Sequence, residues 1–238
     1  MGAVRHKQTT DLGRSNSPAP DRHHESATPE LLAEDSVLAV LLRGIAGSSG
    51  CACFRVMTRS LSEVLGVKYA IIAEFLPESA SARSLAFWTG DGADGFAENV
   101  EWPLAGTPCH DVISGRLSHH PDGLQQQFPE DRPLIDLGAV SYLGVPLQTP
   151  EGAVLGHLFV MDTRPMPPEP RNLAIFRIFA ARAASELCRL RLERELAAGE
   201  ERLQDLFDEA PIAYVHEGLD SRFIRANRAA MRILGITS

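Results

Sequence analysis

Two pairs of apolar segments, each rich in β-branched and aromatic residues, constrain the fold of this chain most strongly. Segments 67–77 (VKYAIIAEFLP) and 82–90 (ARSLAFWTG) lie on either side of a short turn-forming sequence, and segments 139–148 (AVSYLGVPLQ) and 153–162 (AVLGHLFVMD) flank TPEG. Strand-forming runs separated by a few turn residues are typical of β-hairpins. Because the two strands of a hairpin pair antiparallel, the sequence predicts an antiparallel sheet.

Helical periodicity surrounds these hairpins. Segments 30–47 and 51–66 repeat apolar residues every three or four positions, and Gly66 is placed to end the second segment. A short third strand is predicted at 99–106, and a long helix is predicted to start near Asn172, after a proline-rich turn. This order of elements predicts an α+β fold, with an antiparallel sheet, helices on one face and a long C-terminal helix.

The N-terminal segment and the net charge narrow the classes of protein to be considered. Residues 1–30 contain almost no large apolar side chains, so they cannot offset the entropy of ordering and are predicted to form a disordered tail. No apolar run approaches the roughly 20 residues that span a bilayer, and no secretory signal is recognised. A net charge of −8 provides no bulk attraction to nucleic acid or anionic membranes. A cytoplasmic protein without direct nucleic-acid or membrane contacts is therefore expected.

The long helix carries a heptad pattern. Its apolar residues recur at spacings of three and four, and they are Leu173, Phe176, Ala180, Ala183, Leu187 and Leu190. The pattern then shifts phase and continues with Leu196, Leu203 and Leu206. A seam that outlasts the preceding domain is typical of a helix that pairs with a copy of itself, so a homodimer through residues 172–210 is expected. A helix folded back on its own domain is the alternative.

Residues 104–123 (LAGTPCHDVISGRLSHHPDG) gather five chemically versatile side chains in one short stretch, namely Cys109, His110, Asp111, His119 and His120. Thr107 followed by Pro108 is a favourable helix start, with Thr107 as the N-cap, and it places CHDVISGR on a short helix. The stretch is compatible with a nucleophile beside a base, with a metal site, or with the wall of a small-molecule pocket.

Side-chain directions disfavour a metal site. Cys109 and His110 diverge by about 100° on a helix, and His119 and His120 alternate if that segment is extended. The four cysteines form no CxxC motif, so reduced thiols are expected. No metal site is predicted.

The tract AGTPCHDV…FPED…LGAVSYLGVPL, together with YAIIAEFLPE and RSLAFWTGD, resembles a GAF domain across residues 31 to about 195. The particular resemblance is to bacterial regulators of the formate hydrogenlyase activator kind. Residues 200–238 are similar to the opening of a PAS domain, with strands AYVHE and FIRAN and a helix that starts at Asn227. The predicted organisation is a tail at 1–30, a GAF domain at 31–171, a signalling helix or coiled-coil linker at 172–210 and an N-terminal PAS fragment at 211–238.

The resemblance implies that this chain is the sensory region of a longer signal-transduction protein. The chain itself is not expected to be an enzyme, and any effector activity is expected to lie outside it. Its ligand would lie between the sheet and the short helix and loops on one face. The residues expected to contact a small polar or anionic ligand are His119, Cys109, Thr107, His110, Trp88 and Tyr142, with His119 as the first choice. The identity of the ligand and of any cofactor is left open. The subtype implies a sigma-54-dependent transcription activator as the effector, with a histidine kinase or a diguanylate cyclase as the alternative.

Two further roles for Cys109 follow from other members of the fold family. Free methionine sulfoxide reductases use pocket cysteines, and such an enzyme needs a low-pKa thiolate and a resolving thiol. No second cysteine lies in the loops around Cys109. A Cys-His pair also attaches bilins in phytochrome-like GAF domains, where it lies just ahead of the last hairpin, whereas here residues 111–138 intervene.

Overall fold

The computed structural model describes residues 49–91, 94–219 and 222–235. The predicted tail at 1–30 and the predicted helix at 30–47 lie outside the described residues. The helices are α2 (Cys51–Leu65), α3 (Cys109–Ile113), α4 (Leu124–Gln127), α5 (Arg132–Asp136), α6 (Pro170–Glu209) and α7 (Arg228–Leu234). The strands are β1 (Tyr69–Leu76), β2 (Ser81–Trp88), β3 (Phe96–Ala97), β4 (Glu101–Pro103), β5 (Ser118–His120), β6 (Ser141–Gln148), β7 (Val154–Asp162), β8 (Val215–Glu217) and β9 (Phe223–Ala226).

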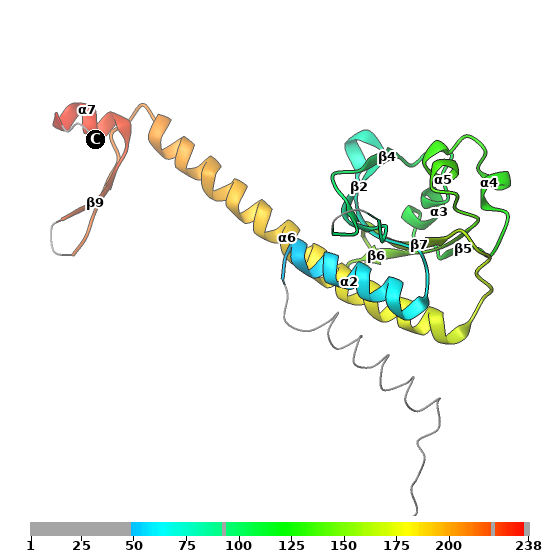
Figure 1. The fold of residues 1–238 in the computed structure, drawn as a ribbon. Coiled ribbons are helices and arrows are strands. Elements are labelled where there is room, and N and C mark those ends of the chain that lie inside the picture. Colours follow the sequence, from blue (N-terminus) through cyan, green and yellow to red (C-terminus); the bar gives the residue numbers. More distant parts are fainter. Residues whose placement is uncertain (1–48, 92–93, 220–221, 236–238) are drawn as a thin grey trace, which may run out of the picture.

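Both predicted hairpins are present and are joined into one antiparallel sheet. β1 pairs with β2 and β6 pairs with β7, in registers that place Ile71 opposite Phe87 and Val145 opposite Leu158. The hairpins meet where β1 pairs with β7, so segments far apart in the sequence form the centre of the sheet. The strand order is β3-β2-β1-β7-β6-β5, and β4 pairs with β2 beside it (Figure 1).

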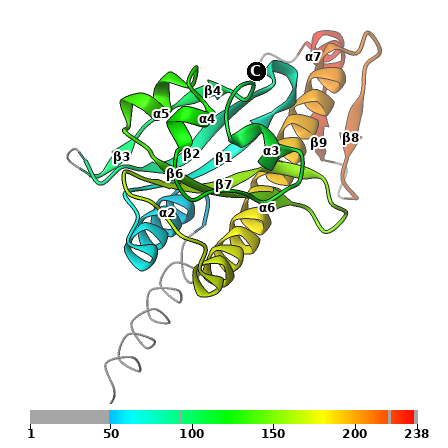
Figure 2. The same ribbon diagram turned by 90° about the vertical axis from the view of Figure 1, so that its right-hand side faces the viewer.

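Strand alternation divides the interior into two layers, one on each face of the sheet. Ile72 and Leu158 belong to the layer that packs against α2 and α6. Ile71 and Phe159 belong to the layer beneath α3, α4 and α5. Figures 1 and 2 show α2 and α6 side by side against one face, and Figure 1 shows the three short helices on the other. The predicted α+β fold is confirmed, with both long helices on one face of the antiparallel sheet.

Helix ends follow local signals in one case and depart from them in another. Gly66 adopts a φ of 64° and its N–H donates to the carbonyl of Ser62, so α2 ends where glycine predicts. α3 has only five residues, and Thr107 does not cap it. The Thr107 hydroxyl donates to the carbonyl of Leu104 at 2.8 Å, and the Thr107 N–H donates to the same oxygen. The expected capping role of Thr107 was therefore wrong.

The first half of α6 is a core element of its own domain. Phe176, Phe179, Ala183 and Leu187 are buried against the sheet. Phe176, Ala183 and Leu187 are part of the heptad pattern of 173–190, and Phe179 lies beside it. Because these side chains already pack on the sheet, a second copy of the chain cannot pack against them. That seam is intramolecular, so a dimer cannot form through it without opening the core.

The second half of α6 projects away from the sheet (Figure 1). Leu192, Leu196, Leu203 and Leu206 are each at least 60% exposed. They recur at spacings of four, seven and three residues, so they continue along one side of the helix. Across the described ranges, none of the helices combines the length and the apolar character that a membrane-spanning segment requires.

A small hairpin and helix follow α6. β8 pairs antiparallel with β9, and α7 begins after Asn227, whose side-chain oxygen accepts from the Ala230 N–H at 3.0 Å. The predicted order of strand, turn, strand and Asn-capped helix is therefore present. Ile224 and Ile233 are 60% and 76% exposed, as expected for a two-stranded sheet that covers little apolar surface.

Candidate ligand-binding site

A cavity of about 90 Å³ lies on the face of the sheet that carries the short helices. The strands contribute its floor, while α3, α5 and the edge strand β4 contribute its walls. Most of its lining is apolar or aromatic, and the lining residues are Ile71, Phe87, Val100, Glu101, Trp102, Pro108, Cys109, Asp131, Pro133, Leu134, Leu137, Tyr142, Phe159 and Met161.

Cys109 lies at the start of α3 and is only 4% exposed. The Tyr142 hydroxyl lies 3.5 Å from its Sγ. Burial raises the pKa of Cys109 to about 12, although hydrogen bonds from the side chains of Tyr142 and Trp102 act in the opposite direction. The thiol is therefore neutral at physiological pH, because removing the group from water disfavours the thiolate more than these donors favour it.

Tyr142 supplies a second neutral polar group. Its ring is fully buried and stacks on Phe159, with the centroids 5.3 Å apart. The close fit requires glycine at position 144, where a Cβ would collide with the Tyr142 hydroxyl. Burial raises the pKa of Tyr142 well above its ordinary value, so its hydroxyl remains a hydrogen-bond donor.

His157 lies directly behind two of the cavity walls. Its ring stacks on Phe159 at 5.0 Å and meets Trp102 edge-on at 6.0 Å. The residue is fully buried, and among the described residues no donor or acceptor reaches either ring nitrogen. Leaving a buried polar atom unpaired costs about 1–3 kcal/mol. Burial lowers the pKa of His157 to about 3, so the imidazole is neutral.

Sequence reasoning missed His157, although a signal was present. It is the one strongly polar side chain within the apolar run AVLGHLFVM of a predicted core strand. Buried polar side chains are nearly always hydrogen-bonded, so a histidine at such a position identifies a site that needs explanation.

Two acidic side chains line the cavity. Asp131 and Glu101 are lining residues, and no lysine or arginine is among the described ones. Burial raises the pKa of Asp131. The Leu134 backbone N–H, which donates a hydrogen bond to the carboxylate at 3.3 Å, acts in the opposite direction and does not cancel this shift. The other polar side chains of the lining, Cys109, Tyr142 and the indole of Trp102, are neutral, so the cavity offers no cation to an anionic ligand.

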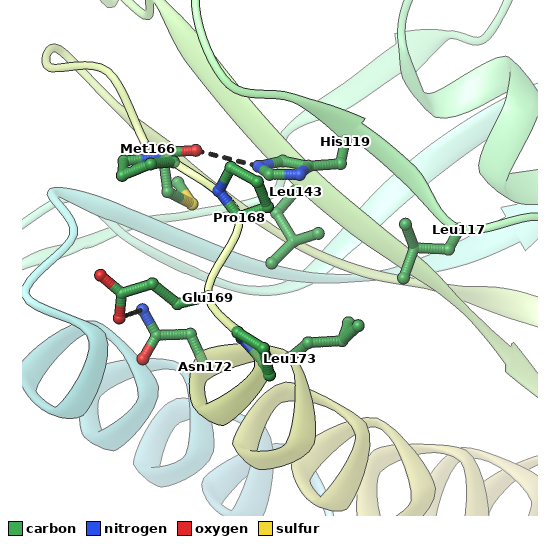
Figure 3. Close-up of a pocket in the computed structure, with 10 residues that line it drawn as sticks. Leu117, His119, Leu143, Met166, Pro168, Glu169, Asn172 and Leu173 are labelled. Atoms are coloured by element: carbon green, nitrogen blue, oxygen red, sulfur yellow. Dashed lines mark hydrogen bonds between the residues drawn. The ribbon is translucent and has the colours of Figure 1, made fainter.

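His119 lies on the opposite face of the sheet from Cys109. It lines a separate cavity of about 250 Å³ between β5, the proline-rich turn and the start of α6. Figure 3 shows its ring above Pro168, with Nε2 directed at the carbonyl of Met166 at a distance of 3.0 Å. Below it, the Asn172 side chain donates to Glu169 at 3.0 Å. His119 and Cys109 therefore cannot contact one ligand in this arrangement.

The other expected contact residues are dispersed. Trp88 belongs to the layer that packs against α2 and α6, and its ring meets Phe96 of β3 edge-on at 5.0 Å. His110 is exposed on α3, and the buried Thr107 hydroxyl is engaged by Leu104. Of the six residues expected to contact a ligand, the structure brings only Cys109 and Tyr142 together in this cavity. Within the described ranges, no group of three or more His, Cys, Asp or Glu side chains is arranged to hold a metal ion.

Comparisons with known proteins agree with this architecture. The sequence profile of the GAF domain matches residues 52–187. No curated protein shows significant similarity to the sequence.

Similar solved structures include the GAF domain of a phosphoenolpyruvate-protein phosphotransferase from Acinetobacter, with 13% identity, a TM-score of 0.55, and coverage of 69% of this chain and 98% of that one. The corresponding domain from Coxiella burnetii has 14% identity, a TM-score of 0.57 and coverage of 68% and 96%. The chromophore-binding domain of a bacteriophytochrome from R. palustris has 10% identity, a TM-score of 0.52 and coverage of 67% and 62%. At these identities the likeness concerns the fold.

Proposed function

This chain belongs to the GAF domain family, and from that premise we propose that it is the sensory region of a signal-transduction protein. A small molecule binds in the cavity beside Cys109 and changes the packing of α6. One observation carries the proposal, namely that a cavity with neutral hydrogen-bonding groups lies on one face of the sheet while the long helix packs against the other.

The connection between cavity and helix runs through β7. Phe159 and Met161 line the cavity. A few residues earlier on the same strand, the Leu155 carbonyl accepts a hydrogen bond from Arg191 of α6 at 2.8 Å. A shift of β7 on ligand binding therefore acts on α6 at the point where that helix leaves the domain. Regulation requires that the ligand bind the two packings with different affinity.

The output of the proposed sensor is a change in a helix pair. The exposed leucines at 192, 196, 203 and 206 provide a seam for a second copy of the chain. The hairpin and Asn-capped helix at the end of α6 support assignment of residues 211–238 to the start of a PAS domain. We propose a sigma-54-dependent transcription activator as the effector, and a histidine kinase or diguanylate cyclase as the alternative.

Thiol-based reduction is the rival function from a different class. A reductase of that kind needs a low-pKa thiolate, whereas the pKa of Cys109 is about 12. Cys53 and Cys188 pack on the opposite face of the sheet from Cys109. These observations favour a binding role for Cys109 over a catalytic one.

Bilin binding is disfavoured by size. One matched cyanobacterial phytochrome GAF domain is described as phycocyanobilin-bound. The cavity of this chain is about 90 Å³, well below the roughly 300–1,000 Å³ of pockets for drug-sized ligands. The proposed ligand is therefore much smaller than a tetrapyrrole.

The proposal is tested by filling the cavity. Cys109→Leu places extra apolar atoms in it, and Cys188→Leu makes the same change on the α6 side as a matched control. Small neutral compounds are screened for a rise in melting temperature, which reports binding to the folded state, and hits are followed by hydrogen exchange of residues 188–209. The expected result is that hits stabilise the wild type and the control, alter exchange in α6, and do neither in Cys109→Leu. Hits that act equally on all three proteins contradict the proposal.

A further inference from the structure

The unpaired imidazole of His157 calls for a partner that the described residues do not provide. A neutral imidazole carries one N–H donor and one acceptor, and both of its nitrogens are buried without a hydrogen bond. Its neighbours across the strands are Ala73 on β1 and Pro146 on β6, and neither side chain has a polar atom. The side chains around the imidazole are therefore apolar.

Trp102 separates His157 from the cavity. The indole meets the rings of both His157 and Phe159 edge-on, at 6.0 and 5.9 Å, and it also lines the cavity. It belongs to β4, a strand of three residues paired with β2 at the margin of the sheet. Because the strand is short and lies at the margin, rotation of the indole away from Cys109 would leave the central strands paired, and it would join the cavity to His157.

The surroundings define the chemistry of the group that replaces the indole. Tyr142, Phe159 and His157 form a continuous stack of rings. The indole meets two of these rings edge-on, and a planar aromatic ligand can make the same edge-on contacts. Asp131 and Glu101 line the cavity, and no lysine or arginine is among its described lining residues, so an anion is disfavoured. The volume of about 90 Å³, enlarged by what Trp102 vacates, suits one or two rings.

We propose that His157 is the recognition residue for a small neutral aromatic ligand that carries an O–H or N–H group, and that Trp102 is the cover displaced when this ligand binds. The proposal rests on the sensory function proposed above and specifies the ligand class for the same site. The ligand's polar group pairs with the imidazole, while its ring meets Phe159 edge-on in place of the indole.

Calorimetric titration with phenol and indole tests the proposal. Benzoate, an anionic ring, and cyclohexanol, a non-planar alcohol, serve as probes of charge and shape. Phenol or indole is expected to bind the wild-type chain, and phenol is expected to change the fluorescence of Trp102, recorded in a Trp88→Phe background. His157→Phe is expected to weaken binding by roughly tenfold, because one hydrogen bond is lost. His110→Phe, at an exposed histidine, is the matched control and is expected to bind as the wild type does.

A spectroscopic measurement reports on the imidazole directly. The ¹⁵N chemical shifts of the His157 ring are expected to move when the site is saturated with phenol.

Several results overturn the proposal. They are equal binding by wild type and His157→Phe, binding of benzoate or cyclohexanol as tight as that of phenol, and failure of both phenol and indole to bind. If Cys109→Leu abolishes binding while His157→Phe does not, the cavity is the sensory site and only the role of His157 is rejected. If Cys109→Leu leaves binding of the probes unchanged, the site of the proposed function is itself wrong.

Discussion

The carboxylate of Glu74, buried at the end of β1, accepts a hydrogen bond of 2.9 Å from Nε of Arg191 on α6. The same guanidinium donates to the carbonyls of Phe75 and Leu155, and Arg194 adds a second contact to the carboxylate. Burial alone would raise the pKa of Glu74, but the hydrogen bonds and charges of Arg191 and Arg194 outweigh it and hold that pKa below its ordinary value. This ion pair ties the sheet to α6 just after Leu187, the last helix residue fully inside the core.

Glu74→Gln is expected to lower the free energy of unfolding by about 3 kcal/mol, near the lower end for breaking a buried pair, because the arginines are partly exposed. It is also expected to speed hydrogen exchange in residues 188–209. Urea denaturation and exchange mass spectrometry check both effects. Glu193→Gln, at an exposed carboxylate of the same helix, is the control, and equal behaviour of the two variants contradicts a coupling role for Glu74.

The stability of the chain is expected to fall in mild acid because of His157. The pKa of the folded imidazole is about 3, against an ordinary value of 6.5. Between these values the unfolded chain binds a proton that the folded chain does not, so stability is lost as pH falls through this window. The loss is at most about 1.4 kcal/mol per pH unit.

His157→Phe removes this contribution. Urea titrations of both proteins between pH 5 and 6.5, above the range where carboxylates dominate, are expected to give a shallower slope for the variant. Parallel slopes would show that the imidazole is hydrated in solution and titrates normally.

Association of two copies is expected to use the exposed part of α6. Leu196→Asp with Leu203→Asp is expected to give a smaller species in light scattering with an unchanged circular dichroism spectrum, because both side chains are more than 60% exposed. Leu187→Asp is expected to unfold the domain instead, since a charge would enter the core. A wild-type chain that is monomeric at tens of micromolar rules out the seam.

Among the described residues, proteases are expected to cut first in the hairpin and helix that follow α6. Few apolar side chains are covered there, and Phe223 and Ile224 are 59% and 60% exposed. Local opening of such a segment requires little free energy. Limited proteolysis should cut between about 210 and 235 before it cuts the sheet. Asn227→Ala should accelerate that cleavage by removing the α7 cap, and equal protection of both regions would count against this expectation.

His119→Ala is expected to act near α6 rather than in the Cys109 cavity. The substitution removes the hydrogen bond to the Met166 carbonyl, which is worth about 1 kcal/mol. Phenol or indole binding should be unchanged, because His119 faces the other side of the sheet. Loss of probe binding in this variant would restore His119 as the first-choice contact that the sequence alone favoured.

The sequence by itself determined the elements of this fold. Runs rich in β-branched and aromatic residues predicted both hairpins, three-four spacing predicted α2 and α6, and Gly66 and Asn227 marked a helix end and a helix start. These signals are local, since each depends on side chains within one or two turns or one strand, so they can be read without knowing what packs against them.

The tertiary structure decided which of these side chains share a site. His119 and His120 are adjacent, yet strand alternation sends one toward α6 and the other toward Tyr142. Which face each residue meets depends on the pairing of β5 with β6, and a shift of one residue would exchange them. The heptad of α6 likewise could not reveal whether its partner was a second chain or the sheet, because burial of either kind selects the same apolar spacing. His157 became visible as a site only when the register of β7 placed it, without a hydrogen-bonding neighbour, behind Phe159 and Trp102.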